Sequence, residues 1–411
     1  MKVCHLTLCV LLMWTLTGCW DQIELEEQAY VVGIGLDKSE KQGTVKVTLQ
    51  IANPEVGSAA KGSQTTEAPQ EIVTFTSTDF ISARHTANAF VTRSITFQLV
   101  SVIVVSEELA REEDFYQFLF ATAKDKSIRR DVNLIVTSEK AEDFIRSVQS
   151  TLETRPHKFY QFMMDRGIVT GLIPKATIHR FLFTTEGDAD LFLSMHATTK
   201  TADGKQGYED EYLAGQIEQK GGSPSQFIGS GVFKEGKLIG YLNGEETRLS
   251  LLLDPTVKIK EIIATFKDPL SEQYRITVRI ILSEKPTLDM QLKKEPAQIH
   301  AEIPIGIEIL NIPSMVDYAC NMKNQTLLKA SIEDELNQKF AALIRKTQTT
   351  LKGEPFHWSL HARKAYLTQA AYQKADWFKM YPNMQIDIQT KVSINRFGKQ
   401  IKLPSQDHIK D

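Results

Sequence analysis

The longest apolar stretch of this chain is its beginning, and that placement limits what the remainder can fold into. Residues 3–17 contain no Asp, Glu, Lys or Arg, and four acidic residues follow between positions 21 and 27. A membrane-spanning helix needs about 20 apolar residues, so this shorter stretch is typical of an export signal that is removed. The remainder is therefore expected to be a water-facing body with its own buried cores.

The end of this signal indicates how the mature protein is held at a membrane. Leu16, Thr17, Gly18 and Cys19 are an apolar residue, two small residues and a cysteine, and they resemble the bacterial lipobox. A cysteine thiolate is a good nucleophile for lipid transfer, and small residues let the signal peptidase close on an extended chain. We predict a lipoprotein signal peptide at residues 1–18, recognised through Leu16, Thr17 and Gly18. Cys19 then carries S-diacylglycerol and an N-palmitoyl chain, and two or more acyl chains anchor a protein stably.

Composition excludes several classes of protein. The 411 residues include 48 Lys and Arg against 51 Asp and Glu, a net charge of −3, so no global basic field exists to hold nucleic acid. Hydrophobic residues make up 42% and charged residues 24%, which is typical of a soluble globular body and not of a disordered chain.

Cysteine usage leaves no internal disulfide. Cys4 and Cys9 lie in the signal and Cys19 takes the lipid, so Cys320 is the single cysteine left over. We interpret Cys320 as a small structural residue, because no histidine partner can be assigned to it as a nucleophile.

Hydrophobic periodicity predicts an α+β protein of two to three domains, each a mixed or mainly antiparallel sheet packed with helices. Strand and helix patterns alternate between residues 99 and 152, where 99–105 is apolar enough for a strand covered on both faces. The strongest break is the Gly- and Ser-rich run at 221–225. The expected division is a lipidated tether (19–28), an N-terminal α/β domain (29–200), a linker (201–225), a C-terminal α/β domain that may subdivide (226–400) and a tail (401–411).

The C-terminal half carries the clearest patterns. Glu235-Gly236 between two apolar runs predicts a tight hairpin, and residues 274–282 alternate as a half-buried strand. Residues 321–351 are expected to form one long helix, and 363–378 a second. The long helix places an apolar stripe on one face: Leu328, Ile332, Leu336, Phe340 and Leu343.

Motifs of catalysis or metal binding do not assemble. Gly33 and Gly35 lack the third glycine of a dinucleotide fingerprint. His357 and His361 have the spacing of two metal ligands on a helix but lack the glutamate of a zinc peptidase, so we interpret them as surface positions. The charged run 125–131 suits either a partner contact or a solvated turn. We therefore expect no catalytic residue, no metal and no cofactor apart from the lipid on Cys19.

Short segments spread along the chain resemble one family, the Ger(x)C spore-germination lipoproteins. The likeness begins with Gly18-Cys19-Trp20-Asp21-x-x-Glu24-Leu25 and the stretch 32–38, and it continues through 106–110 and Asp125-x-x-Ile128-Arg129. It ends with 230–242, Glu245-Glu246-Thr247 and 394–398, so it covers nearly the whole mature chain. Gln98 and Lys124 depart from the family pattern of His and Arg, at positions without an assigned chemical role.

The resemblance implies a non-enzymatic subunit of a nutrient germinant receptor. Such proteins are lipid-anchored on the extracytoplasmic face of the spore inner membrane and assemble with polytopic A- and B-type subunits to trigger germination. Only Cys19 carries over as a defined site. The alternative is a solute-binding lipoprotein of a transporter, which predicts two similar lobes around a polar cleft, and a lipid-anchored hydrolase is a more distant third.

Overall fold

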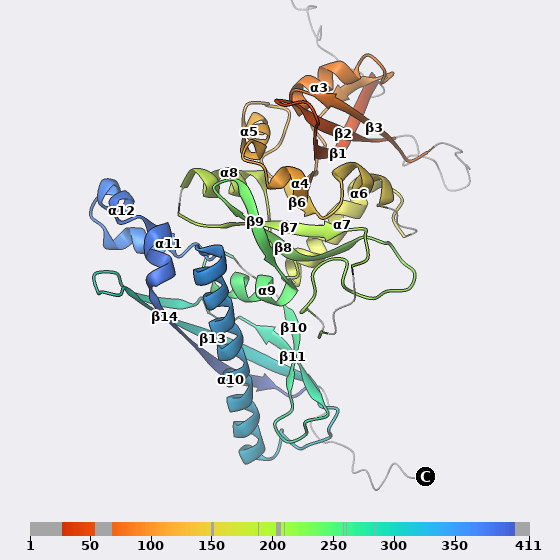
Figure 1. Ribbon diagram of the computed structural model, residues 1–411. Coiled ribbons are helices and arrows are strands. Elements are labelled where there is room, and N and C mark those ends of the chain that lie inside the picture. Colours follow the sequence, from red (N-terminus) through yellow and green to blue (C-terminus); the bar gives the residue numbers. More distant parts are fainter. Residues whose placement is uncertain are drawn as a thin grey trace, which may run out of the picture.

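A computed structural model describes residues 27–53, 68–148, 152–187, 189–202, 207–208, 210–257, 259, 261–282 and 284–398. Two β-sheets with their helices make up this part of the chain, one above the other in Figure 1. The predicted signal peptide, Cys19 and the tail 401–411 lie outside the described residues. None of the helices in the described ranges combines the length and apolar content that crossing a bilayer requires.

Within the described residues, nine strands form sheet A in the order β3-β2-β1-β5-β6-β7-β8-β9, with β4 also beside β1. The pairs β1–β5, β5–β6 and β6–β7 are parallel, and antiparallel ribbons flank them on both sides. The strands are β1 (Gln28–Lys38), β2 (Val45–Ala52), β3 (Gln70–Ser77), β4 (Ser94–Thr96), β5 (Val102–Ser106), β6 (Asn133–Thr137), β7 (Phe192–Thr198), β8 (Gln226–Lys234) and β9 (Lys237–Leu242). Every residue of β5 is buried, as predicted for a strand covered on both faces.

Helices cover sheet A because its central strands are apolar on both faces. They are α3 (Phe80–Ala87), α4 (Glu107–Ala110), α5 (Phe115–Phe120) with η2 (Ala121–Ala123), α6 (Ala141–Ser147), α7 (Pro156–Val169) and α8 (Ile178–Gly187). Gly35 of β1 has a clear role in this packing, since a Cβ there would lie 2.8 Å from Ile145 Cδ1 of α6. Gly35 thus serves helix–sheet packing, whereas a Cβ at Gly33 would meet Gln50 and Val102 of the neighbouring strands.

Sheet B is mainly antiparallel and belongs to the C-terminal half. Its order is β10-β11-β13-β12, and β14 pairs in parallel with the long β13. The strands are β10 (Ile262–Lys267), β11 (Arg275–Ile281), β12 (Thr287–Gln291), β13 (Gln298–Asn311) and β14 (Gln385–Arg396). In β11 the alternation predicted from sequence is confirmed, with Ile276, Val278 and Ile280 buried.

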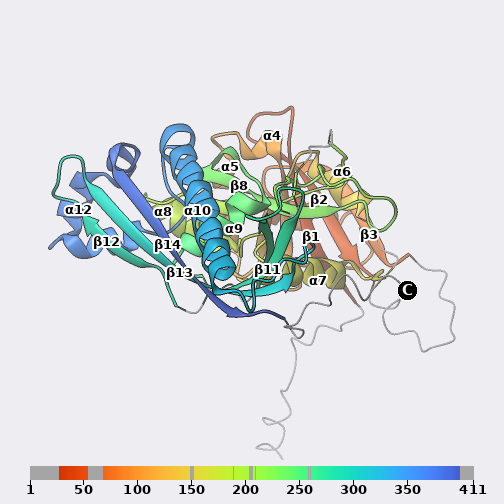
Figure 2. The same cartoon turned by 90° about the horizontal axis from the view of Figure 1, so that it is seen from below.

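The predicted long helix is present and lies along sheet B. Helix α10 (Met322–Lys346) continues into a π-helical turn, η3 (Thr347–Leu351), and Figure 2 shows it lying over β13 and β14. Its apolar stripe is the predicted one: Leu328, Ile332, Leu336, Phe340 and Leu343 are each at most 2% exposed. The mixed α+β class predicted from sequence is confirmed.

The predicted second helix at 363–378 is wrong in detail, because the chain there forms three short pieces. They are η4 (Arg363–Ala365), α12 (Gln369–Ala375) and α13 (Trp377–Met380), preceded by α11 (Ser359–Ala362) and followed by η5 (Tyr381–Asn383). Thr368 starts α12 by accepting a hydrogen bond from Ala371 N at 3.1 Å. Asp376, with φ of 52°, ends that helix and caps the next one.

The first sheet does not end at the expected linker. Strands β8 and β9, which the sequence assigned to the C-terminal domain, extend sheet A, because β8 pairs with β7 and β9 pairs with β8. They form the predicted hairpin, in which Glu235 and Gly236 have φ of 51° and 82°, the positive values of a type I′ turn. Helix α9 (Gly244–Leu253) then leads to sheet B.

The two halves also share a hydrophobic core. Leu193, Val232 and Leu242 of sheet A cluster with the apolar faces of α10 and sheet B. Sequence periodicity marks each strand but cannot say which sheet edge it joins, so the membership of β8 and β9 in sheet A was not predicted.

Candidate functional site

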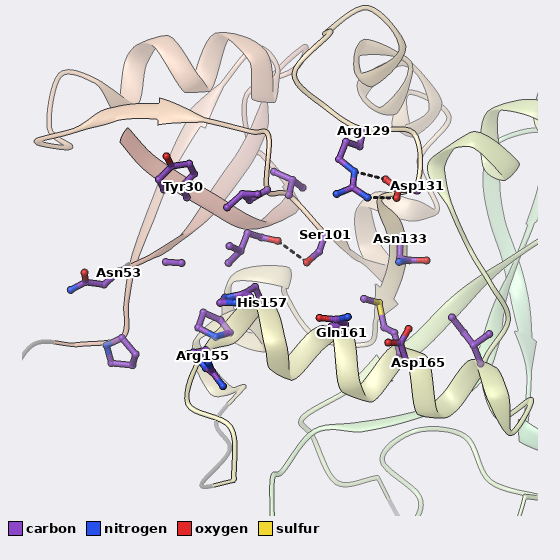
Figure 3. A pocket seen from close by; sticks show the side chains of 18 residues that line it. Tyr30, Asn53, Ser101, Arg129, Asp131, Asn133, Arg155, His157, Gln161 and Asp165 are labelled. Atoms are coloured by element: carbon purple, nitrogen blue, oxygen red, sulfur yellow. Dashed lines mark hydrogen bonds and ion pairs between the residues drawn. The ribbon is translucent and has the colours of Figure 1, made fainter. Parts of the chain in front are cut away.

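A cavity of about 490 Å³ opens at the amino-terminal edge of the parallel strands of sheet A (Figure 3). Tyr30 comes from the first residues of β1, Ser101 precedes β5, and Asn133 begins β6. Because parallel strands begin at the same edge, residues about 30 positions apart or more meet here. A space of this volume would hold roughly sixteen water molecules, so it is not a packing defect.

Helix α7 forms one wall of the cavity. Its lining residues are His157, Gln161, Met164, Asp165 and Ile168, which recur at the three- and four-residue spacing of one helix face. Pro156 at the first helical position supplies a preset φ and needs no amide partner there.

The cavity has an apolar interior and a polar rim. Val32, Val100, Pro156 and Met164 line it and are buried. This mixture of an apolar base with a few polar groups is the usual composition of small-molecule sites.

Two arginines at the rim are each held by a neighbouring carboxylate. Arg129 donates from Nε to Asp131 Oδ1 at 2.9 Å and from Nη2 to Asp131 Oδ2, and these bonds hold the pKa of Asp131 below its usual range. Arg155 donates from Nε and Nη2 to the two oxygens of Glu153 at 2.8 and 2.9 Å. Each bidentate pair occupies one edge of the guanidinium and fixes its orientation.

The surroundings of His157 favour its neutral form. Burial lowers the pKa of its imidazole from 6.5, and the positive charges of Lys158 and Arg155 lower it further. A neutral imidazole offers one donor and one acceptor, so His157 can bind either kind of group.

One acceptor of the lining is left without a partner. Asn133 Oδ1 is buried and accepts no hydrogen bond within the described chain, whereas the Asp165 carboxylate is exposed to solvent. Figure 3 shows Arg129, Asn133 and Asp165 along the same side of the cavity. An unsatisfied buried acceptor is costly, so Asn133 marks a position where a donor from a bound molecule is favourable.

The opposite, carboxyl-terminal edge of the parallel strands is closed by its own side chains. Open α/β sheets usually bind ligands there. Here Asp37 accepts from Ala141 N at 2.7 Å and from Glu142 N at 3.0 Å, which caps α6. Glu139 likewise accepts from Thr199 N and Thr199 Oγ1 at 2.7 and 2.8 Å.

The histidine pair singled out from sequence does not form a site. His357 lies before α11 with φ of 56° and is buried, with its Nδ1 3.0 Å from Asp254 Oδ2, so the surface position predicted for it is wrong. His361 is in the helix and partly exposed. No group of three or more metal-ligating side chains occurs among the residues that the structure describes. Cys320, interpreted from sequence as a small structural residue, is exposed and forms no disulfide within the described residues.

Sequence reasoning found one element of the cavity and missed the rest. The charged run 125–131 contributes Arg129 and Asp131 to the rim. The face of α7 was visible as a repeat of polar residues, His157, Gln161 and Asp165, but nothing in it indicated which strands it faced. Cys19, Leu16, Thr17 and Gly18 lie outside the described residues.

Family models match most of the chain. A model described as the spore germination protein N-terminal domain matches residues 21–197, and one described as spore germination B3/GerAC like, C-terminal, matches 228–398.

Individual relatives extend the similarity over the full length. Spore germination protein KC of Bacillus subtilis (strain 168) is 24% identical over 97% of this chain and 96% of the relative. Spore germination protein A3 of the same strain is 28% identical over 34% of this chain and 36% of the relative. A crystal structure of the GerBC protein has the same fold, with a TM-score of 0.51 and 15% identity over 91% of this chain and 99% of that one.

Proposed function

This chain belongs to the GerAC-like family of spore germination proteins, and from that membership we propose that it is a non-enzymatic, lipid-anchored subunit of a nutrient germinant receptor. The observation that carries the proposal is the match of both family models in order along the chain. The confirmed resemblance and the lipobox ending in Cys19 support the same role.

The anchor is consistent with the position of the first strand. Eight residues lie between Cys19 and Gln28, where β1 begins, and the nine Cα–Cα steps of such a chain, fully extended, reach about 30 Å. Anchored in this way, the amino-terminal edge of sheet A stays within that reach of the extracytoplasmic membrane surface. Polytopic A- and B-type subunits in the same membrane are the partners that we propose.

A purely binding role is supported by how the polar groups of the cavity are arranged. Ser101 donates to Val32 O at 3.1 Å and does not contact His157, so the described lining holds no paired nucleophile and base. The rival reading, a solute-binding lipoprotein, predicts two similar lobes. The nine strands of sheet A and the five of sheet B differ in topology, and the cavity lies in one half.

Co-purification from dormant-spore inner membranes tests the proposal. A tagged wild-type chain is compared with Cys19→Ala and with Cys320→Ala, an exposed cysteine that serves as the matched control. We expect the wild type and the control to remain in the membrane with two polytopic receptor subunits, and Cys19→Ala to be released. Recovery with a transport permease instead favours the solute-binding reading, and full retention of Cys19→Ala refutes the anchor.

A further inference from the structure

We propose that the outer edge of strand β14 binds an extended segment of a partner protein as an added strand, and that this segment alternates apolar residues and carries a carboxylate. The place for it is a groove of about 680 Å³ between α10 and residues 386–389 of β14. Figure 2 shows α10 beside this border of sheet B. The inference goes beyond the proposed function, which names partner subunits but assigns no surface to them, and its test uses this protein alone.

The backbone groups of β14 alternate in direction, which identifies those that face the groove. Gln385 N donates to Ala297 O at 2.9 Å, toward the side on which β13 pairs. In a parallel ladder the N–H and C=O of every second residue point to the same neighbour, so the even-numbered residues of β14 point away from β13. No described strand lies on that side, so the outward groups need other partners.

Side chains of α10 and of the turn after it supply partners on both sides of the groove. Gln348 Nε2 donates to Met384 O at 2.8 Å. Asn337 Oδ1 accepts from Thr390 N at 2.9 Å. These two contacts cap the outward groups just before and just after residues 386–389, so the open part of the edge has defined ends.

Ile386 and Ile388 are the two outward-facing residues between these caps. Their N–H and C=O groups have no hydrogen-bond partner in the described part of the chain. Addition of an extended peptide to an exposed sheet edge is a recurrent mode of recognition, in which main-chain hydrogen bonds supply affinity. The six residue steps between the capped positions span about 20 Å, the usual length of one strand.

The floor and the rim of the groove define the side chains of the added strand. Ile386 and Ile388 pack against the core beneath α10, and Ala341 and Ile344 of α10 line the same groove. Because side chains alternate along a strand, every second residue of the added segment meets this apolar floor. At the rim, the Arg345 guanidinium forms no ion pair or hydrogen bond within the described residues, so a carboxylate on the added strand is its complement.

Titration of labelled peptides with the full-length lipoprotein in detergent micelles, followed by fluorescence anisotropy, tests the proposal. The probe is the peptide TVTVEVTVT. One control peptide has its central backbone amides N-methylated, and another has lysine in place of the glutamate. We expect saturable binding of the probe, no binding of the N-methylated peptide, which cannot donate to the edge, and binding of the lysine peptide that is weaker by about tenfold.

Variants locate the site. Ile388→Pro removes an outward N–H and no bond of the β13–β14 ladder, and is expected to weaken the probe about tenfold or more. Arg345→Glu, on the exposed side of α10, is expected to invert the order of the glutamate and lysine peptides, whereas Lys374→Glu, an exposed lysine on α12, leaves both unchanged. Thermal melting verifies that each variant is folded, and the exposed position of Arg345 keeps the test decisive if Ile388→Pro is not.

Three outcomes overturn the proposal. They are the absence of saturable binding, equal binding of the N-methylated peptide, and an Arg345→Glu variant that binds both peptides like the wild type. Dimerisation of the wild type that Ile388→Pro abolishes also overturns it, because the edge then belongs to a second copy of this chain.

Discussion

A buried pair of carboxyl groups, Asp190 and Glu354, is predicted to make this protein less stable as the pH rises. Glu354 accepts hydrogen bonds from Phe356 N at 2.5 Å, Ser359 N at 3.1 Å and Trp377 Nε1 at 3.2 Å. Burial raises the pKa of Glu354 well above 4.5, and the adjacent Asp190 carboxylate raises it further.

The pair needs one proton to be satisfied. Asp190 Oδ2 accepts from Ser359 Oγ at 2.7 Å, but Oδ1 is buried without a donor, and burial raises the pKa of Asp190 as well. Two adjacent buried carboxyls cannot both ionise readily, and a proton held between them supplies the missing donor. We infer that the folded pair keeps a proton at pH values where the unfolded chain has lost both.

The sign and size of the effect follow from linkage. A raised folded-state pKa gives stability that is complete below the unfolded pKa near 4.5 and is lost as the pH rises through the folded value. With one extra proton in the folded state, the free energy of unfolding falls by about 1.4 kcal/mol per pH unit in that window. Asp190→Asn removes one charge and places an amide donor where Oδ1 lacked one.

The variant is therefore expected to match the wild type near pH 5 and to be more stable near pH 8, by about 1.5–3 kcal/mol, the value of a hydrogen bond to a charged group. Trp358 is wholly buried beside this cluster and Trp377 donates to Glu354, so tryptophan fluorescence during urea denaturation reports on it directly. Asp143→Asn, an exposed carboxylate on α6, is the control. An Asp190→Asn effect of equal size at both pH values refutes the shared proton.

Three further predictions concern packing, capping and acid sensitivity. Gly35→Ala forces a Cβ against Ile145 and is expected to cost about 1–3 kcal/mol in chemical denaturation, with Gly43→Ala, at an open turn, differing by the cost of its positive φ alone. Asn243→Ala removes the capping box that Asn243 forms with Glu246, and should lower the free energy of unfolding by about 1 kcal/mol. Burial lowers the pKa of His196 to about 4. The contribution of the neutral imidazole to the free energy of unfolding is therefore complete above pH 6.5 and is lost as the pH falls toward 4. His196→Gln should flatten this acid limb, and an unchanged limb contradicts the assignment.

Local sequence patterns were enough to predict the helices and strands that bury a single apolar face. The stripe on α10 and the alternation in β11 each bury their apolar residues against a single neighbour, so a period of about 3.6 or of 2 was sufficient. The Glu235-Gly236 hairpin was equally local, because its two positive φ values determine the turn. The break at Asp376 was missed, since its left-handed φ is set by the packing of α12 and α13 and not by a glycine or proline.

The cavity could not be predicted because no continuous segment encodes it. Tyr30, Ser101, Asn133 and Asp165 belong to four elements, and only the pairing of β1 with β5 and of β5 with β6 brings the first three to one edge. Strand pairing is a tertiary property that hydrophobic periodicity does not carry. The membership of β8 and β9 in sheet A could not be predicted for the same reason.

The motifs that carry the family resemblance have structural roles in this chain. They are largely different residues from those that line the cavity. Asp37 caps α6, Gly236 completes a hairpin turn, and Glu246 caps α9. Of the polar residues that line the cavity, Arg129 alone belongs to the segments that carry the family resemblance. A family resemblance built on caps and turns predicts the fold, whereas the cavity is lined by residues such as Asn133 and Asp165, which lie outside those segments. Substituting cavity residues should therefore change the lining of the cavity while leaving these caps and turns intact.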